Sequence, residues 1–444
     1  KENSLVWKAV FELLSRQWFG RLWIIQEVIL SRNLYLACGK RRGHWDVFSS
    51  ACLALDECGV GAWLDNKFHG NVFSRLLDLD AEKHEYQRDH TGDSWLFSRL
   101  VNTRRANSWK PKDKVYGLLG IVDAPWVKIS YDDADYPKER LYHDIAAHLL
   151  EHNKVPLSSL LPAVDHEPED GEGKAYRLPS WVADWSQHRV TKELGYKSST
   201  ANVFNASKHV RFKKMKLGVD YGLVDGEKRE LRVPGRVFDT IACLSDVLKD
   251  PDLVHPADNK NWTGCIEFVA DNLPTSPGDT SAFEAFCSVI TAGKDGTGLH
   301  PLPPSSYEII SMLLDESSGK SPTLPGQTYS KRQQLPKGKG KLELASLSSR
   351  EPRMTLQEIR TAMRRALKNR RLGLTKEGRL GLLGLFPRYA KVGDNVGVLA
   401  GAYTPFVLRE TIEGKWQLIG EAYVHGVMHG ERAEGLDDGD IVLV

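Results

Sequence analysis

The run QWFGRLWIIQE, from Gln17 to Glu27, constrains the fold more than any other part of this chain. It combines large apolar side chains with a Gln-Glu pair at helical spacing, which predicts a helix from about Phe19 to Leu30. On such a helix Trp23 and Glu27 lie one turn apart, so the carboxylate lies beside the indole. A carboxyl group held against an aromatic ring can be partly desolvated, which makes Glu27 a candidate catalytic acid.

Length and composition predict a soluble protein with more than one domain. A chain of 444 residues is long enough for two or three domains, each with its own core. The balance of 60 basic and 58 acidic side chains implies no general polyanion partner. The six cysteines lack both CxxC spacing and the density of a secreted disulfide framework, so reduced thiols in the cytoplasm are expected. No apolar run approaches about 18 residues, and no membrane span is expected.

Changes in pattern along the chain predict an α+β fold in four parts. Residues 1–125 show mainly helical periodicity, and residues 126–318 mix strand and helix patterns. Residues 319–353 are rich in Ser, Pro, Gly and Lys and are expected to be a disordered linker or insertion. Residues 354–444 begin with a helix from Thr355 to Asn369 and continue with strands punctuated by glycine. This last part is expected to form a small β-rich domain that folds largely apart from the helical region.

Several blocks resemble the fungal heterokaryon incompatibility (HET) domain and the region that follows it. Residues 17–27 resemble the family's WF-x-R-x-W-x-x-QE block, and residues 110–120 (KPKDKVYGLLG) resemble its DPRDKVYALLGL block. Residues 178–185 (LPSWVADW) resemble LPSWVPDW. Segments within residues 391–426 are similar to the C-terminal domain that often follows HET domains. The blocks occur in the order that the family uses.

Two opening blocks of the HET family, SYxWG and WID-x-LCINQ, do not occur in this sequence. The chain also begins with Lys1 rather than methionine. We therefore expect a fragment or a truncated gene model that holds the last part of a HET domain and its downstream region. The resemblance implies that residues 1–125 are part of a fold related to the Toll/interleukin-receptor (TIR) fold, whose early parallel strands would lie in the missing segment.

The resemblance implies a cytoplasmic protein of fungal non-self recognition and of the programmed cell death that follows fusion of unlike cells. The implied partners are other, unidentified proteins of that pathway and a second copy of the chain, with neither a membrane nor nucleic acid. One alternative is a TIR-like NAD glycohydrolase, and another is a truncated remnant that does not signal. NAD is then the candidate substrate, and no cofactor is expected.

The resemblance also assigns roles to three residues. Glu27 matches the glutamate that NAD-cleaving TIR enzymes carry on a helix, where its charge holds a ribose hydroxyl and stabilises an oxocarbenium-like transition state. Trp23 would form a pocket wall, and Arg21 would contact a phosphate or carboxylate. The alternative is structural, with Trp23 in the core, Arg21 in a surface pair and Glu27 in an internal network. Because the residues that would complete the pocket are missing, we expect this chain alone to be inactive.

Other polar residues are interpreted mainly as structural. Asp113, followed by Lys114, is expected to stabilise the N-terminus of a helix through its charge. Trp181, Asp184 and Trp185 are expected to form a buried plug with a hydrogen-bonded carboxylate, the alternative being a ligand groove. The basic runs, including residues 337–341 and 364–371, lack interleaved aromatic residues and a recognised reader fold, and are expected to be solvated.

The histidines do not predict a metal site. His425 and His429 have a spacing that binds metal only on a helix, and the neighbouring glycines disfavour a helix there. His143, His148 and His152 fall on one amphipathic helix and are expected to form its solvated side.

Overall fold

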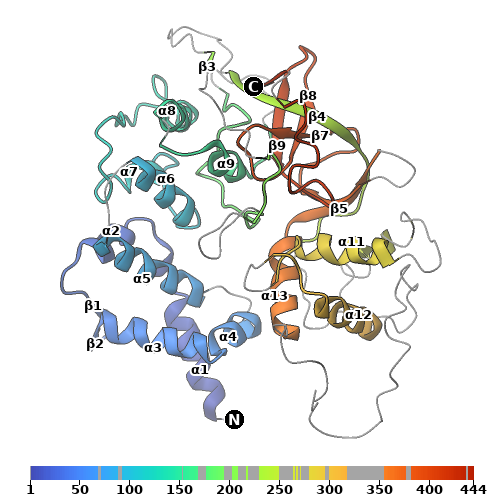
Figure 1. Ribbon diagram of the computed structural model, residues 1–444. Helices are drawn as coiled ribbons and strands as arrows, with labels where there is room; N and C mark the ends of the chain where they lie inside the picture. Colours follow the sequence, from blue (N-terminus) through green and yellow to red (C-terminus); the bar gives the residue numbers. More distant parts are fainter. Residues whose placement is uncertain are drawn as a thin grey trace, which may run out of the picture. The chain divides into compact units, whose positions relative to one another are not determined.

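The computed structural model describes residues 2–68, 72–88, 93–152, 154–168, 177–194, 203–208, 217–218, 230–249, 264–265, 267–268, 271, 280–295, 300–317, 355–376, 382–436 and 439–444. The chain forms two compact units (Figure 1). The helical unit is Lys1–Val155 with Asp184–Arg189, and the barrel unit is Pro156–Ala183 with Val190–Val444. The predicted α+β class is confirmed, with helices at the N-terminal end and strands at the C-terminal end.

Short helices dominate the helical unit, with one β-hairpin among them. The elements are α1 (Glu2–Leu14), η1 (Gln17–Gly20), α2 (Ile24–Leu30), β1 (Tyr35–Cys38), β2 (Arg41–His44), α3 (Trp45–Glu57), α4 (Val60–Phe68), α5 (Val72–Arg88), α6 (Asp93–Asn102), α7 (Asp113–Tyr116) and α8 (Lys138–Glu151). α2 and α3 both pack against α5. The fully buried Trp45 of α3 donates its indole N–H to Asp80 of α5 at 2.7 Å, which satisfies the polar atom of a core aromatic residue.

The helix predicted from Phe19 to Leu30 is interrupted, so that prediction is wrong in its first half. A 3-10 turn ends at Gly20, Arg21 is extended, and α2 begins only at Ile24. The reason is a pair of backbone hydrogen bonds to Asn107. The Asn107 N–H donates to the Gly20 carbonyl at 2.6 Å, and the Leu22 N–H donates to the Asn107 carbonyl at 2.8 Å. These bonds take backbone groups that a continuous helix would have used.

A β-barrel with flanking helices forms most of the barrel unit. The elements are α9 (Leu157–Leu160), η2 (Leu161–Ala163), β3 (Leu217–Gly218), β4 (Glu230–Leu244), α11 (Thr280–Thr291), α12 (Ser305–Ser317), α13 (Leu356–Leu367), β5 (Arg370–Thr375), β6 (Leu383–Pro387), β7 (Asn395–Leu399), β8 (Phe406–Glu410), β9 (Trp416–Glu421), β10 (Tyr423–Val424) and β11 (Asp440–Leu443). β6 to β9 and β11 lie where the glycine-punctuated pattern predicted strands.

The long strand β4 holds the barrel together. It pairs antiparallel with β11, β7 and β5 along successive parts of its length. The ring then runs from β7 through β8 and β9 to β11, with β9 and β11 parallel. Closing the ring removes the free edges that an open sheet would expose. β5, β6 and β10 continue from the far end of β4 as a second curved sheet.

β4 comes from residues that the sequence pattern assigned to the mixed middle region. A module of residues 354–444 on its own would lack this central strand. The expected boundaries between residues 125 and 126, 318 and 319, and 353 and 354 stay predictions, and the expected linker of residues 319–353 lies outside the described residues.

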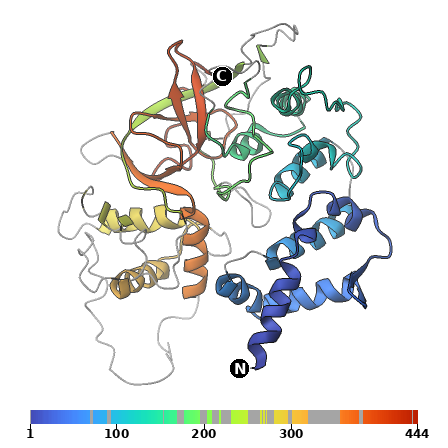
Figure 2. The same ribbon diagram turned by 180° about the vertical axis from the view of Figure 1, so that it is seen from behind.

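Helices α11, α12 and α13 lie together beside β5 and β6, as Figure 2 shows from behind. α13 begins with a capping box, in which Thr355 and Glu358 satisfy each other's backbone N–H groups. Its Ile359, Met363 and Leu367 are fully buried, as the predicted apolar face requires, whereas Leu356 is partly exposed. No helix among the described residues has both the length and the apolar composition to cross a bilayer.

Candidate functional site

The predicted site residues Arg21, Trp23 and Glu27 lie on the protein surface. Trp23 precedes α2 and Glu27 follows one turn later, with the Glu27 N–H donating to the Trp23 carbonyl at 3.4 Å. The predicted one-turn spacing is therefore present. Arg21, Trp23 and Glu27 are all exposed, however, and Trp23 keeps 38% of its surface in solvent. The expected desolvation of the Glu27 carboxylate by the indole is wrong. The catalytic role of Glu27 and the binding roles of Trp23 and Arg21 stay predictions.

Gln26, the neighbour of Glu27, has the structural role that sequence reasoning missed. Its side-chain amide donates to the carbonyl of Gly117 at 2.6 Å. Two glycines allow this close packing. A Cβ on Gly117 would lie 2.8 Å from Leu22, and a Cβ on Gly120 would lie 2.6 Å from Gln26. The run at residues 17–27 therefore packs directly on the run at residues 110–120. The two glycines at helical spacing were a usable signal of this close approach.

Asp113 in α7 is buried and accepts two hydrogen bonds. The phenol of Tyr131 donates to one carboxylate oxygen at 2.8 Å, and the Lys110 N–H donates to the other at 3.3 Å. The pKa of Tyr131 is raised to about 12 by burial and by its hydrogen bond to the charged Asp113. The predicted position of Asp113 in the first turn of a helix is confirmed. In addition, Asp113 fixes the loop that carries Tyr131.

The lysines on either side of Asp113 hold backbone carbonyls. The Lys112 ammonium donates to the carbonyls of Ser130 and Asp132, each at 3.0 Å. The buried Lys114 ammonium donates to the carbonyls of Arg104, at 2.9 Å, and of Ala106. Burial, with the nearby charge of Arg104, lowers the pKa of Lys114 to about 8. Both lysines therefore act as internal donors that join α7 to the segments before and after it.

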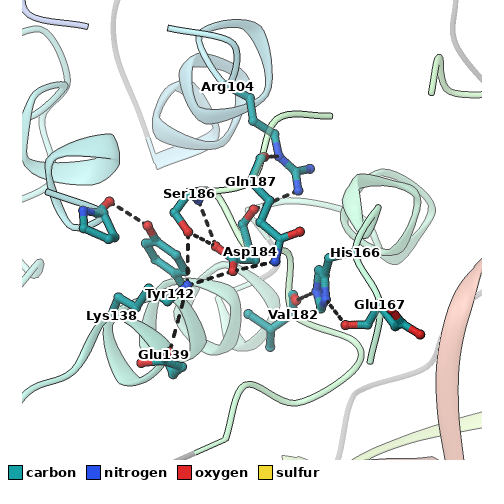
Figure 3. A network of polar contacts seen from close by, with 11 residues as sticks. Arg104, Lys138, Glu139, Tyr142, His166, Glu167, Val182, Asp184, Ser186 and Gln187 are labelled. Carbon is teal, nitrogen blue, oxygen red and sulfur yellow. Dashed lines mark hydrogen bonds and ion pairs between the residues drawn. The ribbon is translucent and has the colours of Figure 1, made fainter. Parts of the chain in front are cut away.

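Asp184 is the centre of a second polar network (Figure 3). Its carboxylate accepts hydrogen bonds from Lys138 at 2.8 Å, from the Ser186 N–H at 2.9 Å and from Gln187 at 3.3 Å. The Ser186 hydroxyl donates to the same carboxylate. Arg104 holds the backbone of this segment, because its guanidinium donates to the carbonyls of Asp184 and Gln187, each at 2.8 Å. The network consists of satisfied internal contacts.

The prediction of a buried plug at residues 178–185 is confirmed. Trp181, Asp184 and Trp185 are each at most 3% exposed. Trp185 packs edge to face on Phe97, with ring centroids 6.0 Å apart. The segment belongs to the barrel unit up to Ala183 and to the helical unit from Asp184 onward. It therefore contributes to both compact units.

The histidines differ from the sequence expectation. The expected solvated side of α8 is wrong for His143, which is 4% exposed, whereas His148 is half-buried and His152 is exposed. His148 stacks on Trp126 with ring centroids 3.6 Å apart. In the barrel unit, the two ring nitrogens of His166 lie 2.9 Å from the Val182 carbonyl and 3.1 Å from the Glu167 carbonyl (Figure 3).

His425 and His429 are not on a helix. Burial is the main cause that lowers the pKa of His425. His429 stacks on His300 at 4.8 Å. The part of the chain that the structure describes contains no cluster of three His, Cys, Asp or Glu side chains arranged to hold a metal ion.

Comparison with known proteins agrees with this architecture. A family model described as the Het-6 beta-barrel domain matches residues 328–444. The chain is related to the fungal heterokaryon incompatibility proteins. It is 24% identical over 476 residues to Heterokaryon incompatibility protein 6, OR allele, of Neurospora crassa, covering 97% of this chain and 67% of that protein. No solved structure matches the chain. β4 lies before the matched residues, so the barrel of this chain begins upstream of the region that the family model covers.

Proposed function

We propose that this chain acts in fungal non-self recognition, in the programmed cell death that follows fusion of genetically unlike cells. The supporting observation is that its similarity to a heterokaryon incompatibility protein spans both compact units, 97% of the chain. The proposed partners are other proteins of the same pathway and a second copy of this chain. A cytoplasmic location agrees with the six cysteines, all of which are free thiols.

The helical unit suits a role as a rigid scaffold for recognition. Asp113, Lys114 and Asp184 are buried and hydrogen-bonded, which fixes the segments that carry them. Their donors and acceptors are occupied by the protein itself. A scaffold of this kind presents its exposed side chains to a partner in one fixed arrangement.

The proposal is tested in a fungal host by inducible expression of the chain in strains that carry different incompatibility alleles. We expect loss of viability, scored by colony counts and uptake of a vital dye, in some allelic combinations and not in others. The matched variants are Asp184→Ala, which removes the centre of a buried network, and Trp109→Ala, which changes a side chain that is 95% exposed. Equal viability in every combination tested, with the protein present at normal abundance, would contradict the proposal.

The second candidate is a TIR-like NAD glycohydrolase, which the placement of Glu27 favours in one respect. Its carboxylate is exposed one turn after Trp23, so a ligand could reach both side chains. In this candidate Glu27 holds a ribose hydroxyl while its charge stabilises the positive charge that develops on the sugar as nicotinamide leaves.

Measuring nicotinamide release from NAD separates the candidates. We expect no release by purified residues 1–444, and release that requires Glu27 in a protein that also carries the missing HET blocks. Release by the 444-residue chain that Glu27→Ala abolishes would establish the glycohydrolase. A chain that neither cleaves NAD nor changes viability in any strain is a remnant that does not signal.

A further inference from the structure

Basic side chains from separate parts of the sequence meet in the helical unit. They are Arg75 of α5, Arg104 and Arg105 after α6, Lys114 of α7, and His188. Arg75, Arg105 and His188 are exposed, whereas Arg104 and Lys114 are buried. Partial burial of the His188 ring, and then the charges of Lys114, Arg75, Arg105 and Arg104, lower the pKa of His188. The four cations therefore act together at the His188 ring.

The backbone around Gly20 brings two further donors to the same place. The amide nitrogen of Asn107 and the guanidinium of Arg75 lie against the Cα of Gly20, where a Cβ would be only 3.3 Å from Asn107 Nδ2 and 3.4 Å from Arg75 Nη1. The two backbone hydrogen bonds that interrupt the predicted helix hold Asn107 there. Gly20 therefore lets an amide and a guanidinium approach the backbone on its side-chain face.

The buried cations connect Asn107 to His188. Lys114 holds the carbonyls of Arg104 and Ala106, immediately before Asn107. Arg104 in turn holds the carbonyls of Asp184 and Gln187, immediately before His188. The positions of Arg105, Asn107 and His188 are therefore fixed by hydrogen bonds to residues that are themselves buried.

Among the described residues, the two exposed arginines of this cluster have no carboxylate partner. Asp184 is already engaged by Lys138, Ser186 and Gln187. With the residues that the structure describes, neither Arg75 nor Arg105 forms an ion pair or a side-chain hydrogen bond. Like charges that are held together repel one another, and a bound anion would offset that cost.

We propose that the Arg75, Arg105, Asn107 and His188 cluster binds a phosphate-bearing small molecule. A guanidinium donates two parallel hydrogen bonds to a phosphate, and two such groups with an amide donor surround one anion. Arg75 and Asn107 meet at a single glycine, and Arg105 lies on the segment that leads to Asn107, a compact arrangement that suits a compact oxyanion better than an extended acidic chain. This binding site does not depend on the proposed role in non-self recognition.

The test is titration of the purified 444-residue protein with inorganic pyrophosphate, measured by calorimetry at low ionic strength. We expect wild-type protein to bind, and Arg75→Ala and Arg105→Ala each to weaken binding by about tenfold or more, as loss of a charge-assisted contact requires. Arg75→Lys keeps the charge but loses the planar fork, so its affinity should lie between those of wild type and Arg75→Ala.

The matched control is Arg42→Ala, which removes an exposed positive charge from β2 of the same unit and should leave the affinity unchanged. Melting curves confirm that each variant folds, since all three arginines are exposed. Failure of the wild type to bind pyrophosphate would overturn the proposal, and so would an equal loss of affinity in Arg42→Ala and Arg75→Ala. Binding of a polyglutamate peptide without binding of pyrophosphate, lost in Arg75→Ala, would assign the cluster to an acidic protein partner instead.

Discussion

Buried side chains chosen from the helical unit and from the barrel unit are held in place by different interactions. In the helical unit, Lys114 and Asp184 are buried so that their charged groups can hold particular backbone atoms. In the barrel, the inward-facing Val396, Val398 and Val407 are fully buried and contribute only apolar surface and shape. The difference between these residues teaches that a similar degree of burial has two energetic origins, satisfied polar contacts at Lys114 and Asp184 and packed volume at the three barrel valines.

The barrel unit should respond most strongly to lost volume. Trp181→Ala removes a side chain that is fully buried, and should lower the free energy of unfolding by about 3–5 kcal/mol. Urea denaturation followed by tryptophan fluorescence and circular dichroism measures this. Trp109→Ala, at a position 95% exposed, is the matched control and should change stability by less than about 0.5 kcal/mol. Similar losses in the two variants would show that Trp181 does not pack as described.

A buried ion pair in the barrel unit tests whether polar contacts also contribute to stability there. Arg370 and Glu421 form a buried ion pair at 3.2 Å, and the Leu194 N–H also donates to Glu421 at 2.7 Å. Arg370→Met removes the guanidinium that pairs with the buried Glu421 and should cost about 3 kcal/mol in equilibrium unfolding. The double variant Arg370→Met/Glu421→Gln should recover part of that loss. A double variant no more stable than the single one would mean that packing of the Arg370 stem, rather than charge, dominates.

The dependence of stability on pH sharpens the comparison. Among the described residues, burial lowers the pKa of Lys114 in the helical unit and of Lys294 in the barrel unit to about 8. In both, burial is the main cause. Between about pH 8 and the ordinary lysine pKa of 10.5, the unfolded chain binds this proton and the folded chain does not. The stability contribution of each lysine therefore rises with pH through that window, by about 1 kcal/mol between pH 7.5 and 9.

Subtracting variant from wild type isolates this effect from the cysteines and tyrosines that titrate at higher pH. The stability difference between wild type and Lys114→Met should rise in favour of wild type from pH 7.5 to 9, and Lys294→Met should give the same slope. Equal stability differences at the two pH values for either variant would contradict the lowered pKa of that lysine.

The smallest effect is expected at Glu27. Because its side chain is exposed, Glu27→Ala should change the free energy of unfolding by less than about 0.5 kcal/mol. Thermal melting beside Trp181→Ala measures the contrast. A loss above about 2 kcal/mol would show that Glu27 belongs to an internal network after all.

The sequence predicted what depends on local periodicity. The helix α13 lies where the pattern placed it, because a helix follows from the spacing of apolar residues along one face. The interruption after Gly20 was not predictable in this way, since it depends on backbone bonds to Asn107, far along the chain. The inclusion of β4 in the barrel was missed for the same reason.

The same distinction between local pattern and distant contacts applies to the site residues. The burial of Trp181 and Trp185 followed from their size and density in a short segment. The exposure of Trp23 did not, because only the position of the neighbouring segments decides which face of α2 is covered. The cluster of Arg75, Arg105 and His188 has no local signature, as its members come from separate segments and are related only through the charges that act on His188.

The pairing of Leu231 with Leu443 has a consequence for the order of events during synthesis. β4 leaves the ribosome long before β11, and at the usual rate of roughly 5–20 residues per second it waits for its partner for ten seconds or more. During that wait β4 is a long strand with unpaired edges, the kind of segment that aggregates or recruits chaperones. The barrel should therefore fold late and all at once, while the helical unit, whose contacts are more local, can form while translation continues.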